Sequence, residues 1–304
     1  MHLLCETYIK SFKLEKINLS RHISLRRSQL FVPGNDERKI KKSLEELDCD
    51  SIILDLEDAV PEDSKSAART LIKRFLSEGL RKQGTKEICV RINQLDSPFS
   101  RDDALVLKDV ELIDAFVVPK AESREKVSEL FRLTGKSLIP LIETARGLIE
   151  INDIAQADGV IAIAYGAADF ANSVHGNVKT YLGNNYVKTT IAVVARAFGI
   201  DPIDNVYFDL ANIEGFKNEA ITSRDLGYSG KQVIHPSQIA PANEIFSLSK
   251  EEVSRAREII NAYEKAMREG TGAIRFQNEL VDAVHYRQAK EILEKQRMIE
   301  ERSH

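Results

Sequence analysis

The fold is decided by Leu138-Ile-Pro-Leu-Ile-Glu143, an apolar run that ends in a carboxylate. About one strand–helix unit later, a second apolar run leads through Tyr165 to Asp169. Buried strands of a parallel sheet or barrel have this pattern, because their carboxyl ends deliver polar side chains to the mouth. Two such carboxylates on neighbouring strands can share a hard cation such as Mg²⁺. Either acid taken alone could equally cap a helix.

The same alternation of short apolar strands and amphipathic helices continues on both sides of this pair. We expect strands at 29–33, 51–58, 87–93, 114–120, 137–143, 159–165, 205–209 and 231–235. We expect helices at 36–47, 64–78, 123–133, 147–156, 186–198, 214–226 and about 249–267. This order predicts an α/β fold, a (β/α)8 TIM barrel. An open doubly wound sheet is the alternative, disfavoured because no GxGxxG turn follows the first strand.

The barrel accounts for residues 27–268, which leaves a segment at each end. Residues 1–26 are rich in Lys and Arg, and we expect a plain N-terminal extension, since Glu6 and Glu15 weaken a transit-peptide interpretation. Residues 269–304 begin with a glycine-containing stretch, and an apolar pair then leads into Asp282 and a helix at 283–295. This pattern predicts a C-terminal hairpin and helix that pack on a neighbour, with Asp282 available as a helix N-cap.

Composition excludes several classes of protein. The chain has 304 residues, 43% hydrophobic and 30% charged, with a net charge of −4, which is typical of a soluble enzyme and gives no reason to expect nucleic-acid binding. No apolar run approaches the length of a membrane span. The three cysteines (Cys5, Cys49 and Cys89) form no CxxC pair, so we expect a reducing compartment, the cytoplasm, or the mitochondrial matrix if residues 1–26 are a transit peptide.

The chemistry of a barrel lies where its strands end. The predicted ends supply Asp55, Glu57, Asp58, Arg91, Asn93, Lys120, Glu143, Asp169, Asp209 and His235. Such an acid-rich set suits a divalent metal and an anionic substrate. Arg91 could clamp a carboxylate, or could form a structural ion pair with Asp55 or Glu57. His235 could be a metal ligand, but a role in anchoring the backbone is favoured because no second His lies at ligand spacing.

Eight short motifs follow one another in a fixed order from residue 26 to 295. They are Arg27-Ser-Gln-Leu-Phe-Val-Pro-Gly-Asn-Asp36, Leu54-Asp-Leu-Glu-Asp58, Val90-Arg-Ile-Asn93, Val118-Pro-Lys-Ala-Glu-Ser123, Leu141-Ile-Glu-Thr-Ala145, Gly166-Ala-Ala-Asp-Phe170, Gly230-Lys-Gln-Val-Ile-His-Pro236 and Leu280-Val-Asp282. In this order they resemble the citrate lyase β-subunit-like (CitE-like) enzymes of the HpcH/HpaI aldolase superfamily, which include malyl-CoA, citramalyl-CoA and citryl lyases.

The resemblance implies a role for each matching position. Glu143 and Asp169 match the two Mg²⁺ ligands, Arg91 matches the arginine that holds the acyl oxygens, and Asp282 matches a catalytic acid/base delivered from an adjacent subunit. Asp55 and Glu57 match groups that hold metal-bound waters or Arg91. The positions that match the coenzyme A (CoA) and acyl cleft are Phe31, Arg38, Lys42, Ile234 and His235. Arg38 and Lys42 also lie four residues apart, which places them on one helix face.

The resemblance also implies the reaction and the partners. Such enzymes cleave a β-hydroxyacyl thioester, for example citramalyl-CoA, malyl-CoA or citryl-CoA, to an acetyl thioester and a 2-oxo acid, or form it by Claisen condensation. It implies Mg²⁺, with Mn²⁺ as a substitute, a CoA or acyl-carrier-protein thioester, and a homo-oligomer, with a trimer as the expectation.

Three further functions stay open. The first is an acyl-CoA thioesterase or malate-synthase-like activity on the same scaffold, and the second is a citrate lyase β subunit that acts on an acyl-carrier protein. The third is a non-catalytic binder of acyl-CoA. This last hypothesis is disfavoured because Arg91, Glu143, Asp169 and Asp282 are all present.

Overall fold

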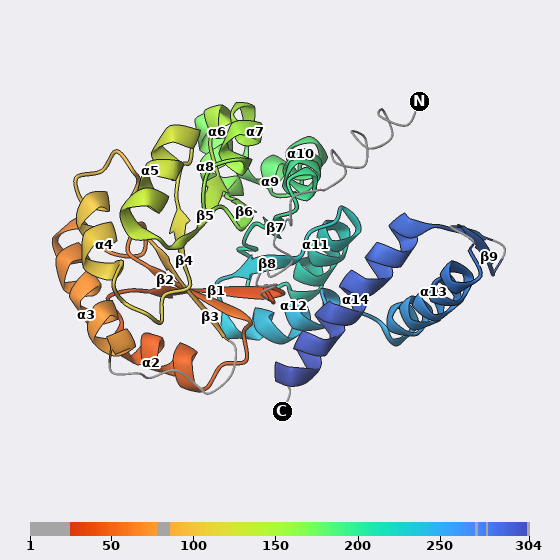
Figure 1. The fold of residues 1–304 in the computed structure, drawn as a ribbon. Helices are drawn as coiled ribbons and strands as arrows, with labels where there is room; N and C mark the ends of the chain where they lie inside the picture. Colours follow the sequence, from red (N-terminus) through yellow and green to blue (C-terminus); the bar gives the residue numbers. More distant parts are fainter. Residues whose placement is uncertain (1–24, 78–85, 271–272, 278, 303–304) are drawn as a thin grey trace, which may run out of the picture.

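Eight parallel strands close into a barrel in the order of the chain (Figure 1). The computed structural model describes residues 25–77, 86–270, 273–277 and 279–302. The strands are β1 (Ser28–Pro33), β2 (Ser51–Asp55), β3 (Glu87–Arg91), β4 (Ala115–Val118), β5 (Ser137–Ile142), β6 (Ala162–Tyr165), β7 (Asp201–Asp204) and β8 (Gly230–Val233). β8 pairs with β1 in parallel and closes the ring. The predicted (β/α)8 barrel is therefore confirmed.

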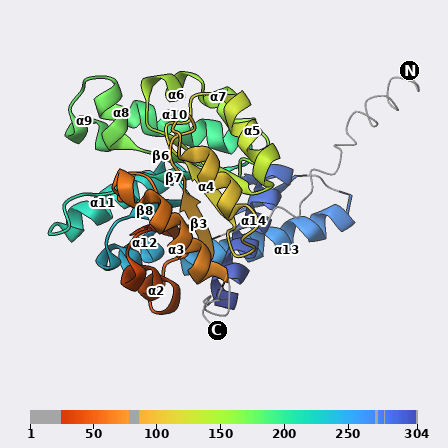
Figure 2. The same ribbon diagram turned by 90° about the vertical axis from the view of Figure 1, so that its left-hand side faces the viewer.

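Helices surround the barrel on all sides, as Figures 1 and 2 show. They are α2 (Glu37–Glu45), α3 (Lys65–Ser77), α4 (Ser100–Leu107), α5 (Arg124–Thr134), α6 (Ala145–Ile149), α7 (Ile151–Ala155), α8 (Ala167–Ser173), α9 (Val178–Leu182), α10 (Asn185–Ala197), α11 (Ile213–Asp225) and α12 (Ile239–Ile245). The sequence pattern did not predict α4, α8, α9 or α12, which are too short for a clear helical period. The helix predicted at 147–156 is broken at Glu150 into α6 and α7.

The predicted seventh strand was wrong. Residues 205–209 are rich in strand-forming side chains, yet the strand that pairs with β6 is Asp201–Asp204. Pairing with the neighbouring strand outweighs local propensity here, as is common for β-structure. Asp209 consequently lies exposed in the loop before α11, and the residue at the strand end is Asp204. Asp204 is buried between Lys188 (2.8 Å) and Lys231 (2.6 Å), outside the barrel mouth.

Two apolar layers hold the barrel together. The layer inside the strands uses small and branched side chains, among them Ile53, Val117 and Ala164. The larger layer between strands and helices includes Ile72, Phe116 and Phe216. Burial of apolar surface on both faces of the sheet is the main stabilising contribution to such a fold.

The base of the barrel, opposite the mouth, is fastened by buried ion pairs. Arg26 contacts Glu87 (2.6 Å) at the start of β3 and Asp201 (2.8 Å) at the start of β7. Residue 26 therefore belongs to the packed barrel, one residue before the predicted start at 27. The rest of the predicted N-terminal extension lies mostly in residues 1–24, outside the described residues.

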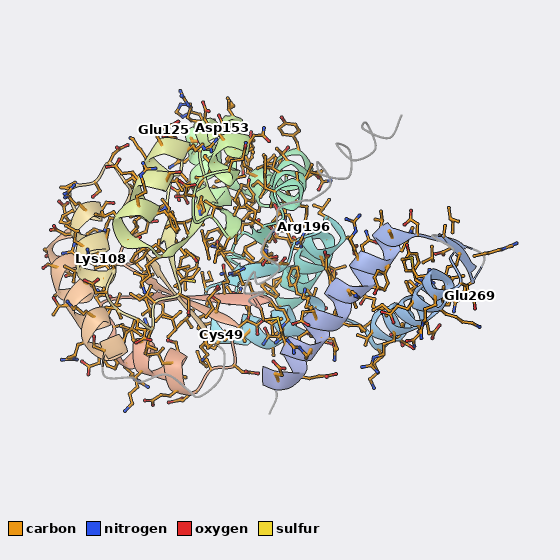
Figure 3. All side chains as sticks on the ribbon, viewed as in Figure 1. Cys49, Lys108, Glu125, Asp153, Arg196 and Glu269 are labelled. Atoms are coloured by element: carbon orange, nitrogen blue, oxygen red, sulfur yellow. The ribbon has the colours of Figure 1, made fainter. Side chains whose placement is uncertain are left out.

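The C-terminal segment forms a helical hairpin with two short strands at its tip. α13 (Lys250–Arg268) and α14 (Ala283–Arg302) pack against each other, and β9 (Ile274–Phe276) pairs with β10 (Glu279–Val281). A separate small core includes Ile259, Tyr263 and Val281. Figure 3 shows Glu269, at the outer end of α13, well away from Cys49 and Lys108 in the barrel. The predicted C-terminal hairpin and helix are thus present.

The C-terminal helix α14 runs beside the base of the barrel (Figure 1). Burial lowers the pKa of Lys295 on α14, and the side chains that interact with it electrostatically include Asp201 and Asp50. These two residues lie at the starts of β7 and β2. The β9–β10 tip is therefore held away from the barrel mouth of its own chain (Figure 1). Within the described residues, no helix is long and apolar enough to cross a membrane.

Candidate active site at the barrel mouth

Arg91 and Asp55 form the fixed part of the mouth. They end the neighbouring strands β3 and β2 and are register partners. Arg91 donates from Nε to Asp55 Oδ1 (2.7 Å) and from Nη2 to Oδ2 (2.6 Å), and its guanidinium lies 5.0 Å from the centre of the Phe31 ring. Burial opposes the charge of Arg91, but Asp55 and Glu57 outweigh it and raise its pKa. Arg91 is therefore a permanent, oriented cation, and the ion pair that the sequence left open is present.

Glu57 connects the arginine to the rest of the site. Its Oε2 lies 2.9 Å from Arg91 Nη1, and its Oε1 lies 3.7 Å from Lys120 Nζ and accepts a hydrogen bond from Gln94 Nε2 (3.2 Å). Asp55 Oδ1 accepts the backbone N–H of Glu57 (2.9 Å), which fixes the loop after β2. Burial raises the pKa of Glu57, and Arg91 partly offsets that effect.

Glu143 follows β5 and is almost fully buried, with 3% of its surface exposed. Its Oε1 accepts the backbone N–H of Lys120 (2.7 Å). Burial, reinforced by the negative charge of Glu57, raises the pKa of Glu143 to about 8. Gly166 makes room for the carboxylate, because a Cβ at that position would lie 2.5 Å from Glu143 Oε2. The structure therefore holds a buried carboxyl group whose charged form needs a cation.

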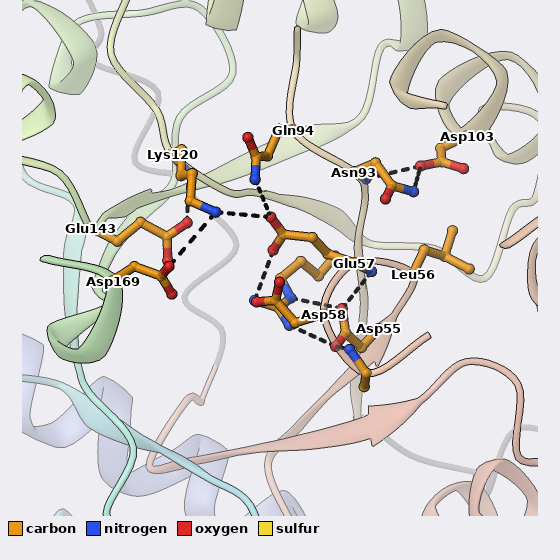
Figure 4. Close-up of polar contacts among 12 residues, drawn as sticks. Asp55, Leu56, Glu57, Asp58, Asn93, Gln94, Asp103, Lys120, Glu143 and Asp169 are labelled. Atoms are coloured by element: carbon orange, nitrogen blue, oxygen red, sulfur yellow. Dashed lines mark hydrogen bonds and ion pairs between the residues drawn. The ribbon is translucent and has the colours of Figure 1, made fainter. Parts of the chain in front are cut away.

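Asp169 lies in the first turn of α8, just beyond β6, and not in the strand itself. It is the more exposed of the two predicted metal ligands. Its Oδ1 lies 3.7 Å from Lys120 Nζ, so a single ammonium faces both Asp169 and Glu57 (Figure 4). Glu143 and Asp169 thus lie next to each other on one side of Lys120, and Glu57 lies on the other (Figure 4).

The sequence led us to expect Lys120 at a strand end as a cation that balances the acids, but did not predict its place between Glu57 and Asp169. Its φ of 45° is in the left-handed region, which is uncommon for a non-glycine residue and a known feature of functional sites. Burial would lower its pKa, but attraction to Glu57, Asp169 and Glu143 raises it. Val118-Pro-Lys120 marked the position in sequence, whereas nothing in the sequence revealed the backbone conformation that turns it into the acidic cluster.

The donor set at the mouth fits Mg²⁺. Glu143 and Asp169 offer hard carboxylate oxygens, and Gly166 keeps the space beside Glu143 Oε2 open. Among the described residues, no group of three or more His, Cys, Asp or Glu side chains is arranged to hold a metal. Mg²⁺ commonly binds through one or two carboxylates and retains waters or substrate oxygens, so two ligands suit it better than they suit Zn²⁺.

A cavity of about 400 Å³ opens beside this cluster. Glu57, Asn93, Gln94 and Phe99 are among its lining residues. Asn93 is held in place by Asp103 of α4, whose Oδ2 accepts from both its backbone N–H (2.9 Å) and its Nδ2 (2.7 Å). The sequence analysis missed both Asp103 and Gln94. Asp103 lies on α4, a helix that the sequence pattern did not predict, and Gln94 lies in the loop after β3.

Phe31 packs on Arg91 in the mouth, and the other predicted CoA-binding residues lie on α2 and after β8. Arg38 and Lys42 are both exposed on α2, which begins after β1. Ile234 and His235 follow β8, and Ile234 N–H donates to Gln238 Oε1 (3.0 Å). His235 caps a short 3₁₀ turn, its Nδ1 accepting the backbone N–H of Ser237 (3.2 Å). The backbone-anchoring arrangement favoured from the sequence is therefore present at His235.

Asp282 is not among the groups gathered at the mouth. It follows β10 at the tip of the C-terminal hairpin, and its side chain is 43% exposed. The flanking side chains are apolar and also exposed, Leu280 by 69% and Val284 by 47%. Hydrogen bonds from His285 and from the backbone of Val284 lower the pKa of Asp282. The tip thus presents an ionised carboxylate within an apolar rim.

Comparison with known proteins defines the class. The family model for HpcH/HpaI aldolase/citrate lyase matches residues 27–236, and the chain belongs to this family. The chain is 34% identical to human mitochondrial citramalyl-CoA lyase over 287 residues, covering 87% of this chain and 84% of that one. It is 36% identical to L-malyl-CoA/β-methylmalyl-CoA lyase of Rhodobacter capsulatus, covering 90% and 95%.

Two further matches bear on the site. The crystal structure of CitE from Mycobacterium tuberculosis in complex with magnesium, acetoacetate and coenzyme A superposes with a TM-score of 0.68 at 28% identity, covering 88% of this chain and 97% of that one. A (3S)-malyl-CoA thioesterase of Cereibacter sphaeroides is 32% identical, covering 88% and 94%. The family resemblance predicted from the eight sequence motifs is confirmed.

Proposed function

We propose that this protein is a Mg²⁺-dependent carbon–carbon lyase that cleaves a β-hydroxyacyl-CoA thioester to an acetyl thioester and a 2-oxo acid, or runs the reverse condensation. The observation that carries the proposal is the mouth itself. The buried carboxylate of Glu143 accepts the backbone N–H of Lys120, and the half-buried Asp169 faces the ammonium of the same lysine. Beside them lies an arginine held by two hydrogen bonds to Asp55. Malyl-CoA, citramalyl-CoA and citryl-CoA are the candidate substrates.

Arg91 is proposed to stabilise the thioester oxygen as negative charge develops on it. Cleavage of the C–C bond leaves an enolate on the acetyl thioester, and its oxygen needs a preorganised positive partner. Arg91 is suited to this because Asp55 already fixes its Nε and Nη2, so no reorganisation is required during the reaction. The Phe31 ring supports the guanidinium from one face.

Glu143 and Asp169 are proposed to hold the metal, and Glu57 to orient Arg91 and waters around it. Mg²⁺ bound there would act as a Lewis acid on the oxygen that becomes the carbonyl of the 2-oxo acid. The raised pKa of Glu143 makes its carboxylate a strong ligand once the proton leaves, because the buried charge then has a cation to offset it.

Asp282 is proposed as the acid/base that exchanges a proton with the acetyl carbon. Its hairpin lies away from the mouth of its own barrel (Figure 1), so we infer that the mouth it serves belongs to a neighbouring copy. The exposed Leu280 and Val284 beside it are apolar surface that such a contact would bury. We therefore propose a homo-oligomer, a trimer being the expectation, in which residues 269–304 of one subunit complete the site of the next.

CoA recognition is proposed to use the surface between α2 and the end of β8. Arg38 and Lys42 are exposed on α2 and would meet phosphates, while the backbone at Ile234 and His235 would line the acyl arm. The buried thiols of Cys49 and Cys89 agree with a reducing compartment such as the cytoplasm.

The test is a coupled assay with purified protein, Mg²⁺ and each of malyl-CoA, citramalyl-CoA and citryl-CoA. We expect one thioester to release glyoxylate, pyruvate or oxaloacetate, and EDTA to abolish that release. Release of free CoA without a 2-oxo acid would instead establish a hydrolase. The 32% identity to a (3S)-malyl-CoA thioesterase makes this the second candidate function.

A further inference from the structure

The carboxylate of Asp282 is held asymmetrically. Its Oδ1 accepts the backbone N–H of Val284 (2.9 Å) and that of His285 (3.4 Å), and lies 2.8 Å from His285 Nδ1. Every hydrogen bond that the described residues make to this carboxylate ends on Oδ1. One oxygen is therefore anchored to the first turn of α14, while Oδ2 accepts no hydrogen bond from the described residues.

His285 makes the anchor reciprocal. Its Nδ1 is also 3.3 Å from the backbone N–H of Asp282, in the manner of a capping box in which each residue caps the backbone of the other. With a proton on Nδ1 the ring donates to Oδ1, and without one it accepts from the backbone of Asp282. The contact with Oδ1 at 2.8 Å is therefore a hydrogen bond in the form with a proton on Nδ1.

The other charged groups around the tip are engaged elsewhere. Arg255 of α13 pairs with Glu279 of β10, and Glu264 of α13 accepts from the hydroxyl of Tyr286. Lys290, one turn further along α14, lies over the Tyr286 ring. His285 is thus the titratable side chain in contact with Asp282 among the described residues.

We infer that His285 is a positioning residue for the acid/base, and that it fixes Oδ1 so that Oδ2 is the atom that exchanges the proton with the acetyl carbon. The inference rests on the proposed function and assigns a role to a residue outside the family motifs quoted above. In condensation, Oδ2 takes a proton from the acetyl methyl group. In cleavage, the same atom returns a proton to the enolate carbon.

The contact with His285 also affects the pKa of the Asp282 carboxyl group. The hydrogen bond from His285 is the largest contribution to the lowered pKa of Asp282, followed by the backbone of Val284. Loss of the imidazole therefore raises the pKa of Asp282. In condensation the carboxylate must be ionised, so the acidic limb of the pH–rate profile moves to higher pH when the imidazole is lost.

The experiment compares His285→Gln and His285→Ala with wild type in both directions of the reaction. Gln at this helix position retains a capping-box side chain, so His285→Gln should fold and assemble as wild type while losing the imidazole. We expect kcat to fall about tenfold in both variants with KM nearly unchanged, because substrate binding does not involve the anchor. The acidic limb for condensation should shift upward in both.

His175→Asn is the matched control, since it removes an exposed imidazole from the loop after α8 at a φ of 55° that Asn tolerates. It should leave kcat and the pH profile unchanged. If wild type is active and the His285 variants match it in kcat and in the acidic limb, this inference is overturned while the proposed function stands. A wild type without lyase or condensing activity would overturn the proposed function and this inference with it.

Discussion

The barrel mouth and the hairpin tip hold their acidic residues in opposite ways. At the mouth, Asp55, Glu57 and Glu143 are each 5% exposed or less and contact Arg91, Lys120 or backbone N–H groups. At the tip, Asp282 is 43% exposed and is held through a single oxygen. Burial raises the pKa of Glu57 and Glu143, whereas hydrogen bonding lowers that of Asp282.

The difference shows why neither region suffices for the proposed reaction. The mouth has groups suited to bind a metal and stabilise an anion. Its buried carboxylates already contact Arg91, Lys120 or backbone N–H groups, so they are poorly placed to accept and return a proton. The tip has a carboxylate with an available oxygen, but the cations Arg255 and Lys290 near it contact other groups. Catalysis by proton transfer and by charge stabilisation each need preorganised groups, and under the proposed function two copies of the chain would together supply both.

The comparison predicts its largest effect at Asp282. Asp282→Asn should lower turnover by about 10³-fold or more, since it removes the only group assigned to proton transfer, and should leave Mg²⁺ and CoA-ester binding intact. Steady-state kinetics and calorimetric binding would measure the two effects. Mixing this variant with Glu143→Gln should restore part of the activity, because a mixed oligomer contains some sites with both native groups.

Glu279→Gln is the control for the loss of a negative charge at the tip. Glu279 lies on β10, three residues before Asp282, and pairs with Arg255. It should retain wild-type turnover. Full activity of Asp282→Asn would remove the tip from the mechanism. Verified mixed oligomers without recovered activity would show that the mouth and the tip are not shared between subunits.

The next largest effect is expected at Arg91. Lys cannot make the paired contact from Nε and Nη2 to Asp55, so Arg91→Lys should lower kcat/KM by about 10²-fold or more. Arg26→Lys is the matched control, because it disturbs a buried Arg–Glu pair at the base of the barrel. Thermal melting should show a loss of stability in both variants, and kinetic assays a loss of catalysis only in Arg91→Lys. Equal losses of activity would mean that Arg91 acts through stability alone.

The sequence predicted the mouth better than the surroundings of the mouth. The barrel, the two strand-end carboxylates and the Arg91–Asp55 pair follow from periodic patterns and from which residues lie at strand ends, and all of these are local features. The position of Lys120 among the acids was not predicted because it depends on a positive φ. Asp103 was not predicted because it lies on α4, whose eight residues show little helical periodicity.

The seventh strand shows the limit of local propensity most clearly. Asp201-Pro-Ile-Asp204 carries a proline and two acids, which a strand disfavours, yet it pairs with β6 because closure of the barrel requires it. Asn205 to Asp209 has the better strand composition and forms a loop. Similarly, the position of Asp282 depends on how α13 and α14 pack against each other, a tertiary arrangement that no motif encodes.

A smaller effect should appear in the stability of the mouth. The pKa of Glu143 is raised from an ordinary 4.5 to about 8. Between these pH values the native state keeps a proton that the unfolded chain has released. The free energy of unfolding in EDTA should therefore fall as pH rises, by at most about 1.4 kcal/mol per pH unit. Glu143→Gln should flatten this slope and be more stable than wild type at pH 8, as urea unfolding at pH 5, 6.5 and 8 would measure.

Two controls sharpen that measurement. Glu129→Gln, an exposed site on α5, should keep the wild-type slope. Added Mg²⁺ should raise the melting temperature of wild type at pH 8 but not that of Glu143→Gln, because only a ligand that binds the native state stabilises it. A Glu143→Gln protein with the wild-type slope and the wild-type response to Mg²⁺ would show that Glu143 neither titrates in this range nor binds the metal.

The smallest effect is expected at Lys120, where the mouth carries its own cation. Its Nζ lies 3.7 Å from both Glu57 and Asp169, so it repels a second cation at the same carboxylates. Lys120→Met should tighten Mg²⁺ binding by about three- to tenfold at low ionic strength, and salt should reduce the gain. Lys126→Met, on exposed α5, removes an ammonium paired with Asp96 and should leave Mg²⁺ affinity unchanged. Calorimetric titration of both variants decides the point, because equal or weaker affinity in Lys120→Met would place the metal away from the Lys120 ammonium and therefore away from Asp169.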